Sequence, residues 1–290
     1  MNRARALPFK CSAVISDVDG TLVTDDKTLT AGAQAAVAKL RANGIIFSMI
    51  SSRPPRGLRT LLEQLQITTP VGGFNGGVIA TPDLTVISEH LLSPQVARRA
   101  VDMLGTRGVE VWIFSGQDWL VRDPDGPYVP LERRTVGFPP TIVGDFGAAL
   151  DAAAKIVGVS NNFDLLVQCE GDVRAALADS ASVARSQPYY LDITHPLANK
   201  GVAFSEIAKL LRVPLSEIAA IGDGANDVAM FERSGLSIAM GNASQQVQHA
   251  ADFVTRSNSE DGFAKAIERF ILRDISSNER FRMARVGGGA

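Results

Sequence analysis

Apolar runs alternate with helical patterns along the first part of the chain. The runs 11–15 and 45–50 are short, and each leads into a polar cluster, which is typical of a buried strand that ends in a loop. Helices are predicted over 30–43, where Thr30 is a candidate N-cap, and over 56–65. This alternation indicates a parallel sheet that helices cover on both faces.

The pattern changes over residues 83–188. Helices are predicted there at 92–104 and 163–177, adjacent strands at 109–114 and 119–122, and an apolar run occupies 155–159. No element is predicted for the Pro- and Gly-rich stretch 123–140. This α+β pattern contains no phosphate-binding loop and no cluster of catalytic residue types. We therefore predict an inserted second domain at 83–188 and a core domain formed by 1–82 and 189–290.

Strand and helix alternate again after residue 188. The run 218–221 is a further buried strand, and it ends in the polar sequence 222–227. The other elements predicted in this part are helices at 202–211, 228–233 and 262–272 and a short strand at 237–240. The predicted fold class is α/β, a doubly wound and mostly parallel sheet that carries an inserted α+β domain.

Composition limits the partners that the chain can have. Hydrophobic residues make up 46% and charged residues 21% of the 290 residues, as in globular proteins, and a net charge of −2 gives no bulk attraction for nucleic acid. Cys11 and Cys169 stand far apart, so a disulfide framework or a zinc site is not expected. No apolar run approaches the roughly 18 residues that span a bilayer. We expect a soluble, cytoplasmic protein without nucleic-acid or membrane partners.

Polar side chains follow three of the predicted strands, beginning at Asp17, at Ser51 and at Asp223. Ligands of an open parallel sheet bind outside the carboxyl ends of its strands, so we expect these clusters to converge. Lys200, at a predicted helix start, adds a cation. Because Lys200 is placed at the site and not in the core, we expect its replacement to cost activity and to change thermal stability little.

The converging residue types suit phosphoryl chemistry. The carboxylates Asp17, Asp19, Asp223 and Asp227 would repel one another without a cation, and oxygen ligands without His or Cys favour Mg²⁺. A lysine and a hydroxyl group can bind a dianionic phosphoryl group, and an aspartate facing phosphorus can form an acyl phosphate. Asp19, two residues after Asp17, projects to the same side if the chain stays extended, where it can protonate the leaving oxygen and later deprotonate water.

Four motifs in this order resemble those of the haloacid dehalogenase-type (HAD) phosphatase superfamily. They are Asp17-Val18-Asp19-Gly20-Thr21, Ser51 at the end of a hydrophobic strand, Lys200 in Asn199-Lys200-Gly201, and Gly222-Asp223-Gly224-Ala225-Asn226-Asp227. The position of the insertion and the loop Phe74–Gly77 are similar to those of the Cof-type subfamily IIB, which has a C2B cap. The resemblance covers about residues 12–272 and implies a HAD-like Rossmannoid core.

The resemblance implies a role for each matched residue. Asp17 would be the nucleophile and a Mg²⁺ ligand, and Asp19 the general acid/base and a ligand through its backbone carbonyl. Asp223 would complete the metal shell, while Asp227 would orient Lys200 or a metal-bound water. Phosphate contacts would come from the Val18 backbone and from Ser51, Ser52, Lys200 and Asn226.

The second motif departs from the family pattern. Members usually read Thr-Gly-Arg where this chain reads Ser51-Ser52-Arg53. The hydroxyl group is retained, so its bond to phosphate is expected to survive. Ser52 in place of glycine matters only if the position requires a positive φ.

The function predicted from these residues is Mg²⁺-dependent hydrolysis of a small phosphomonoester, a sugar phosphate, by way of an aspartyl phosphate. The inserted cap would close over the leaving group and set specificity. One alternative is a sugar phosphomutase that uses the same aspartyl phosphate. The other is a catalytically idle protein that binds a phosphorylated ligand, against which the intact Asp17, Asp19, Lys200 and Asp223 argue.

Overall fold

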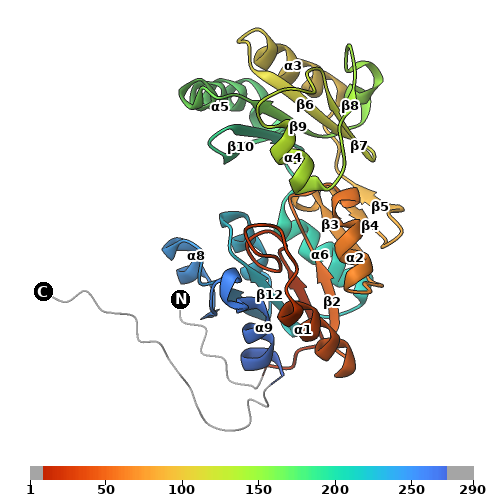
Figure 1. Cartoon of the computed structure of the whole chain (residues 1–290), viewed down its shortest axis with the longest axis vertical. Helices are drawn as coiled ribbons and strands as arrows, with labels where there is room; N and C mark the ends of the chain where they lie inside the picture. The colour runs from red at the N-terminus through yellow and green to blue at the C-terminus, as the bar shows by residue number, and fades with distance from the viewer. Residues whose placement is uncertain (1–8, 273–290) are drawn as a thin grey trace, which may run out of the picture.

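Three β-sheets organise residues 9–272, the part of the chain that the computed structural model describes (Figure 1). The central sheet has five parallel strands in the order β14-β13-β12-β1-β2. Their bounds are β1 Ala13–Ser16, β2 Ile46–Met49, β12 Ile218–Gly222, β13 Leu236–Ala239 and β14 Phe253–Val254. Ser16 of β1 is in register with Met49 of β2 and Ile221 of β12, so the strands that precede the three polar clusters are neighbours. The predicted α/β class is confirmed.

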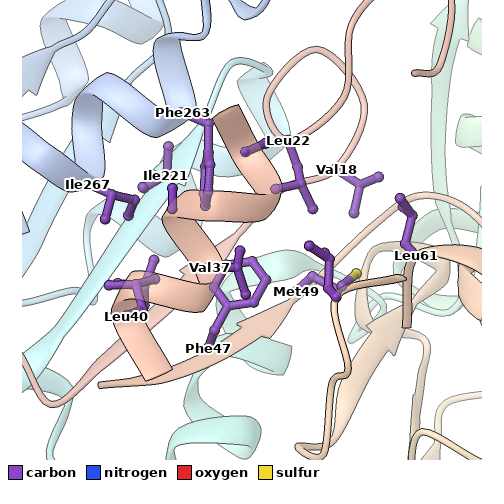
Figure 2. Packing of buried hydrophobic residues seen from close by; sticks show 14 of the residues in the cluster. Val18, Leu22, Val37, Leu40, Phe47, Met49, Leu61, Ile221, Phe263 and Ile267 are labelled. Atoms are coloured by element: carbon purple, nitrogen blue, oxygen red, sulfur yellow. The ribbon is translucent and has the colours of Figure 1, made fainter. Parts of the chain in front are cut away.

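One face of the central sheet packs against α1 (Ala31–Ala42) and α9 (Gly262–Ala266). Figure 2 shows Val37 and Leu40 of α1 beside Phe47 of β2, with Phe263 of α9 close to Phe47. The two Phe rings meet edge to face with centroids 5.8 Å apart. Each fully buried Leu or Phe here contributes about 1.5–3 kcal/mol by leaving water.

The opposite face packs against α6 (Lys200–Leu211), whose Phe204 and Ile207 are fully buried with Ala13 and Ile15 of β1. Successive β1 side chains therefore alternate between the two layers, as expected of a strand that is buried on both faces. The other helices of the core are α2 Arg59–Gln64, α7 Val228–Phe231 and α8 Gln245–Ala250.

Helix α1 begins and ends at the predicted signals. The Thr30 hydroxyl accepts a hydrogen bond from the backbone N–H of Ala33 at 3.0 Å, which satisfies one of the free donors of the first turn. Gly44 follows the helix with φ +71°, a conformation that glycine adopts without steric cost. The N-cap and the stop that the sequence predicts are thus confirmed.

A second, six-stranded sheet with the order β10-β11-β9-β6-β7-β8 forms the upper body in Figure 1. Helices α3 (Pro94–Gly105) and α5 (Phe163–Leu177) pack on one of its faces. The strands are β6 Glu110–Ser115, β7 Asp118–Val121, β8 Thr141–Ile142, β9 Ala153–Val159, β10 Ser182–Gln187 and β11 Tyr190–Thr194. This is the inserted α+β unit that the sequence predicts.

Strand pairing moves both predicted domain boundaries. The boundary at 188/189 cuts the hairpin of β10 and β11, and β11 also pairs with β9, so the inserted sheet extends to Thr194. At the other end, β5 (Val86–Glu89) lies beyond the predicted boundary at 82/83. It joins β3 (Val71–Gly73) and β4 (Val78–Ala80) in a small antiparallel sheet that the sequence analysis did not predict.

One helix lies inside the stretch for which no element is predicted. Helix α4 spans Val129–Val136, with Pro130 in its first turn and Gly137 at its C-cap with φ +80°. Proline is compatible with the first turn of a helix and glycine with its end, so the two residues delimit this helix. Within residues 9–272, none of the helices has the length and the apolar character needed to cross a bilayer.

Candidate active site

The buried amine of Lys200 joins two of the predicted clusters. Lys200 is the first residue of α6, and its Nζ donates to Asp17 Oδ1 at 2.5 Å and to Asp227 Oδ1 at 2.6 Å. Asp17 follows β1, and Asp227 ends the short helix η6 (Ala225–Asp227) after β12. The Lys200 side chain is only 2% exposed. The carboxyl edge of the parallel sheet therefore carries a buried cation bridged by two carboxylates.

Asp17, Asp223 and Asp227 gather around this point, with one oxygen of each within 4.8 Å of the others. Burial raises the pKa of Asp17 well above its usual range, as do the nearby carboxylates, although Lys200 opposes the shift. Burial and the charge of Asp227 also raise the pKa of Asp223. Burial alone would lower the pKa of Lys200, but Asp17 and Asp227 together raise it. With all three carboxyls ionised, one ammonium would leave an excess of negative charge at this edge, and this repulsion contributes to the raised pKa values of Asp17 and Asp223.

This set of donors fits a hard divalent cation. All the candidate ligand atoms are carboxylate oxygens, which Mg²⁺ prefers, and a bound cation would offset the excess charge. Both oxygens of Asp227 are already engaged, because Oδ1 accepts from Lys200 and Oδ2 accepts from the backbone N–H groups of Asp223 and Gly224 at 2.9 and 2.8 Å. Asp227 is therefore suited to hold Lys200 and the 222–227 turn in place. Each oxygen of Asp223 accepts one hydrogen bond and keeps a lone pair, as does Asp17 Oδ1, so Asp17 and Asp223 are better placed as metal ligands.

The Asp223 carboxylate is positioned by residues from two other loops. Thr21 Oγ1 donates to Asp223 Oδ1 at 3.0 Å, and Asn242 Nδ2 donates to Asp223 Oδ2 at 3.1 Å and to the Gly20 carbonyl at 2.9 Å. A Cβ atom at Gly20 would come within 2.3 Å of Asp223 Oδ2, so only glycine lets the two loops approach this closely. The sequence analysis did not identify Asn242, which lies in no motif.

Asp19 lies in ion pairs of its own. Its carboxylate accepts from Arg53 Nε and Nη2 at 2.8 and 2.7 Å and lies 2.8 Å from Lys27 Nζ. Burial raises the pKa of Asp19, but the hydrogen bonds and charges of Arg53 and Lys27 outweigh burial and hold the pKa below its ordinary value. Asp19 is therefore ionised at neutral pH. No role was predicted for Arg53 or Lys27, because their contact with Asp19 depends on how the loops fold.

The residues expected to contact phosphate line the same edge. Ser51 is fully buried, and its Oγ accepts from the Arg53 backbone N–H at 3.1 Å. The backbone at Ser52 does not have a positive φ, so this position does not require glycine and serine carries no backbone strain there. The carbonyl of Val18 accepts from the N–H groups of the following turn, at 2.9 Å from Leu22. The predicted hydroxyl group therefore follows β2, the neighbour of the strand that Asp17 follows, and the predicted turn begins directly after Asp17.

Asn226 connects the fourth motif to the loop Phe74–Gly77. Its Nδ2 donates to Asn75 Oδ1 at 2.9 Å. Phe74 and Asn75 have φ values of +53° and +58°, in the left-handed region that most residues avoid. Phe74 is buried and packs against Phe114 of the inserted unit, with ring centroids 5.6 Å apart. The loop therefore contacts both the candidate site and the inserted sheet.

The fold and the site define a class of protein. A doubly wound sheet that carries carboxylates, a lysine and a hydroxyl group at its carboxyl edge is the architecture of an α/β enzyme that transfers phosphoryl groups. The sequence profile of the haloacid dehalogenase-like hydrolases matches residues 14–267. The chain belongs to this family, and it is an enzyme of the phosphatase class.

Individual proteins agree with this assignment. The chain is 28% identical over 266 residues to the 5-amino-6-(5-phospho-D-ribitylamino)uracil phosphatase YitU of Bacillus subtilis, with 88% of this chain and 95% of the relative covered. A haloacid dehalogenase-like hydrolase from Bacteroides thetaiotaomicron superposes with a TM-score of 0.83 at 28% identity, over 90% of this chain and 99% of that one. The HAD subclass IIB sugar phosphatase BT4131 shares the fold, with a TM-score of 0.76, 22% identity and coverage of 89% and 98%. The predicted HAD superfamily and Cof-type subfamily are confirmed.

Proposed function

We propose that this enzyme is a Mg²⁺-dependent phosphomonoesterase that hydrolyses a small sugar or polyol phosphate through an aspartyl phosphate on Asp17. The observation that carries the proposal is the buried contact of Asp17 with Lys200 beside Asp223, with Ser51 following the neighbouring strand β2. Such a site offers a carboxylate nucleophile and a cation to the same dianionic group. The printed names of YitU and BT4131, a ribitylamino-uracil phosphatase and a sugar phosphatase, support this substrate class.

Asp17 and Asp223 would hold the metal through their side chains, and Asp19 would do so through its backbone carbonyl. When bound, Mg²⁺ neutralises charge on the phosphoryl oxygens. Lys200 adds a second positive charge at Asp17, and its bond to Asp227 fixes its position. Ser51, Ser52, Asn226 and the Val18 N–H would donate to the remaining phosphoryl oxygens.

The reaction proceeds in two displacements at phosphorus. The ion pairs of Asp19 keep its carboxylate ionised, so the first displacement requires that this carboxylate first takes a proton from solvent. An Asp17 carboxylate oxygen then forms a bond to phosphorus as the ester P–O bond breaks, and the leaving alkoxide takes that proton from Asp19. Water then attacks the same phosphorus, Asp19 accepts its proton, and the Asp17 carboxylate is restored. The ion pairs of Asp19 with Arg53 and Lys27 favour its ionised form, which is the form that the second displacement requires.

The inserted unit would act as the cap, and the pairing of β11 with β9 and of β5 with β4 supports boundaries near residues 90 and 194. Its helix α4 approaches the core closely, because a Cβ atom at Gly57 would come within 2.9 Å of the Val136 carbonyl. Closure of this unit over the leaving group would exclude water and select the substrate.

Phosphate release from a panel of phosphorylated metabolites tests the proposal, with Asp17→Asn as the matched control. We expect Mg²⁺-dependent release from sugar phosphates by the native enzyme and none by the variant. Isomerised sugar phosphate formed only with a sugar bisphosphate activator would instead identify a mutase. Saturable binding without release would identify an idle phospho-ligand-binding protein.

A further inference from the structure

A cleft of about 900 Å³ opens between the core and the inserted unit beside Asp19. Two of its lining residues, Lys27 and Arg53, are the partners of the Asp19 carboxylate. The opposite wall comes from the end of α4 and the residues that follow it, including Arg134 and Phe138. Because Asp19 is the proposed proton donor to the leaving oxygen, the cleft begins where the leaving group of a bound ester would lie.

The walls of this cleft are strongly basic. Its basic lining residues are Lys27, Arg53, Arg56, Arg59 and Arg134, whereas Asp83 is its acidic lining residue. The chain as a whole has slightly more acidic than basic residues, 31 against 29, so this concentration of positive charge is local. A cleft lined by one sign of charge attracts ligands of the opposite sign.

Three of these arginines are not committed to strong internal ion pairs. Arg59 and Arg134 make no ion pair or side-chain hydrogen bond with any residue between 9 and 272. Arg56 has two weak polar contacts, with Asp118 at 4.0 Å and with the Gln117 carbonyl at 3.4 Å, both through Nη1. Its guanidinium lies 4.3 Å from the centroid of the Phe138 ring. Stacking on Phe138 orients the Arg56 fork while leaving N–H donors free for an anion.

We propose that this cleft binds a second anionic group, carried by the leaving group of the substrate, through Arg56 and Arg134. The inference rests on the proposed phosphatase function and narrows its substrate class to sugar or polyol phosphates that also bear a carboxylate or a second phosphate. Both groups present oxygens that an arginine fork binds through two parallel hydrogen bonds. Lys27 and Arg53 stay with Asp19, so the distal anion is held by arginines outside the reacting centre.

Matched substrate pairs test this proposal. Glucose 6-phosphate is compared with 6-phosphogluconate, which adds a carboxylate, and fructose 1-phosphate with fructose 1,6-bisphosphate, which adds a phosphate. We expect the full-length enzyme with Mg²⁺ to favour the more anionic member of at least one pair by roughly 10-fold in kcat/KM, the effect of one charge-assisted contact. Preference in the first pair alone would indicate a carboxylate, and preference in the second alone a phosphate.

Arg134→Gln and Arg56→Gln are expected to reduce that preference by about 10-fold, mainly through KM. Arg133→Gln is the matched control, because Arg133 is exposed on the same helix and does not line the cleft. Thermal unfolding checks that each variant is folded. The inference would be overturned if the native enzyme had equal kcat/KM values for the two members of both pairs. It would also be overturned if Arg134→Gln lost the same factor in kcat/KM on both members of a pair. In either case, hydrolysis of p-nitrophenyl phosphate by the native enzyme would still support the proposed phosphatase function. Absence of hydrolysis of every ester by the native enzyme would overturn both.

Discussion

Replacing Lys200 with methionine removes the cation that bridges Asp17 and Asp227 while keeping a side chain of similar length. From the sequence, Lys200 is predicted at the site and not in the core, so little change in stability is expected on its replacement. The premise that Lys200 lies outside the core is wrong, because its side chain is 2% exposed and lies between two buried carboxylates. Loss of one partner from a buried ion pair leaves uncompensated charge and costs about 3–5 kcal/mol. At roughly 2 °C per kcal/mol for a chain of this size, Tm falls by about 6–10 °C.

The loss of stability should depend on pH in a defined direction. Burial already raises the pKa of Asp17, and without Lys200 to oppose the shift this pKa rises further, so the folded variant binds more protons than the folded native enzyme. Stability of the variant relative to the native enzyme therefore decreases as pH rises from mildly acidic to neutral values. Mg²⁺ should recover part of the loss, since a ligand at 100 times its Kd adds about 2.7 kcal/mol.

The assay is thermal unfolding followed by circular dichroism, in EDTA and in excess Mg²⁺, at acidic and neutral pH. Lys209→Met is the matched control, because Lys209 is exposed on the same helix. Steady-state kinetics on the same samples should give a loss in kcat of roughly 10²–10³ for Lys200→Met. A Tm in EDTA equal to that of Lys209→Met would refute the reasoning, whatever the activity.

Three further predictions follow from the site. EDTA should abolish hydrolysis of an aryl phosphate and Mg²⁺ should restore it, with Ca²⁺ a poor substitute because it favours longer bonds and more ligands; full activity after chelation would contradict the oxygen-ligand site. Asp19→Asn should slow hydrolysis of a sugar phosphate by about 10²–10⁴, but release of nitrophenol much less, with an initial nitrophenol burst; equal losses without a burst would exclude proton transfer by Asp19. Asn242→Ala should raise the Mg²⁺ concentration for half-activation about 10-fold by freeing the Asp223 carboxylate; an unchanged metal requirement would show that Asn242 does not position this ligand.

The convergence of the site could be predicted because it follows from strand order and direction. Asp17 and Asp223 end neighbouring parallel strands, and a strand direction fixes which edge its terminal residue occupies. The salt bridges of Asp19 could not be predicted in the same way. Arg53 follows β2 and Lys27 lies in the loop before α1, and only the folded loops bring both to the same carboxylate.

The misassigned elements also have identifiable causes. Pro130 and Gly137 are breakers inside a helix but compatible with its first turn and its end, so α4 was hidden by the residues that delimit it. Strands β3 and β4 have three residues each, too few to establish an alternating pattern, and Gly72 and Gly73 weaken the strand signal further. Asn242 acts through contacts with Asp223 and Gly20, far from it in the sequence, which no local spacing encodes.

Chemical trapping of the phosphorylated enzyme tests most directly the claim that Asp17 carries the phosphoryl group. Asp19→Asn is quenched in acid during turnover of an aryl phosphate and reduced with borohydride, which converts an aspartyl phosphate to homoserine, and the peptides are then sequenced by mass spectrometry. The account predicts homoserine at position 17 and none when Asp17→Asn is added to the same variant. Reduction at any other aspartate, or a nitrophenol burst without modification at position 17, would contradict it.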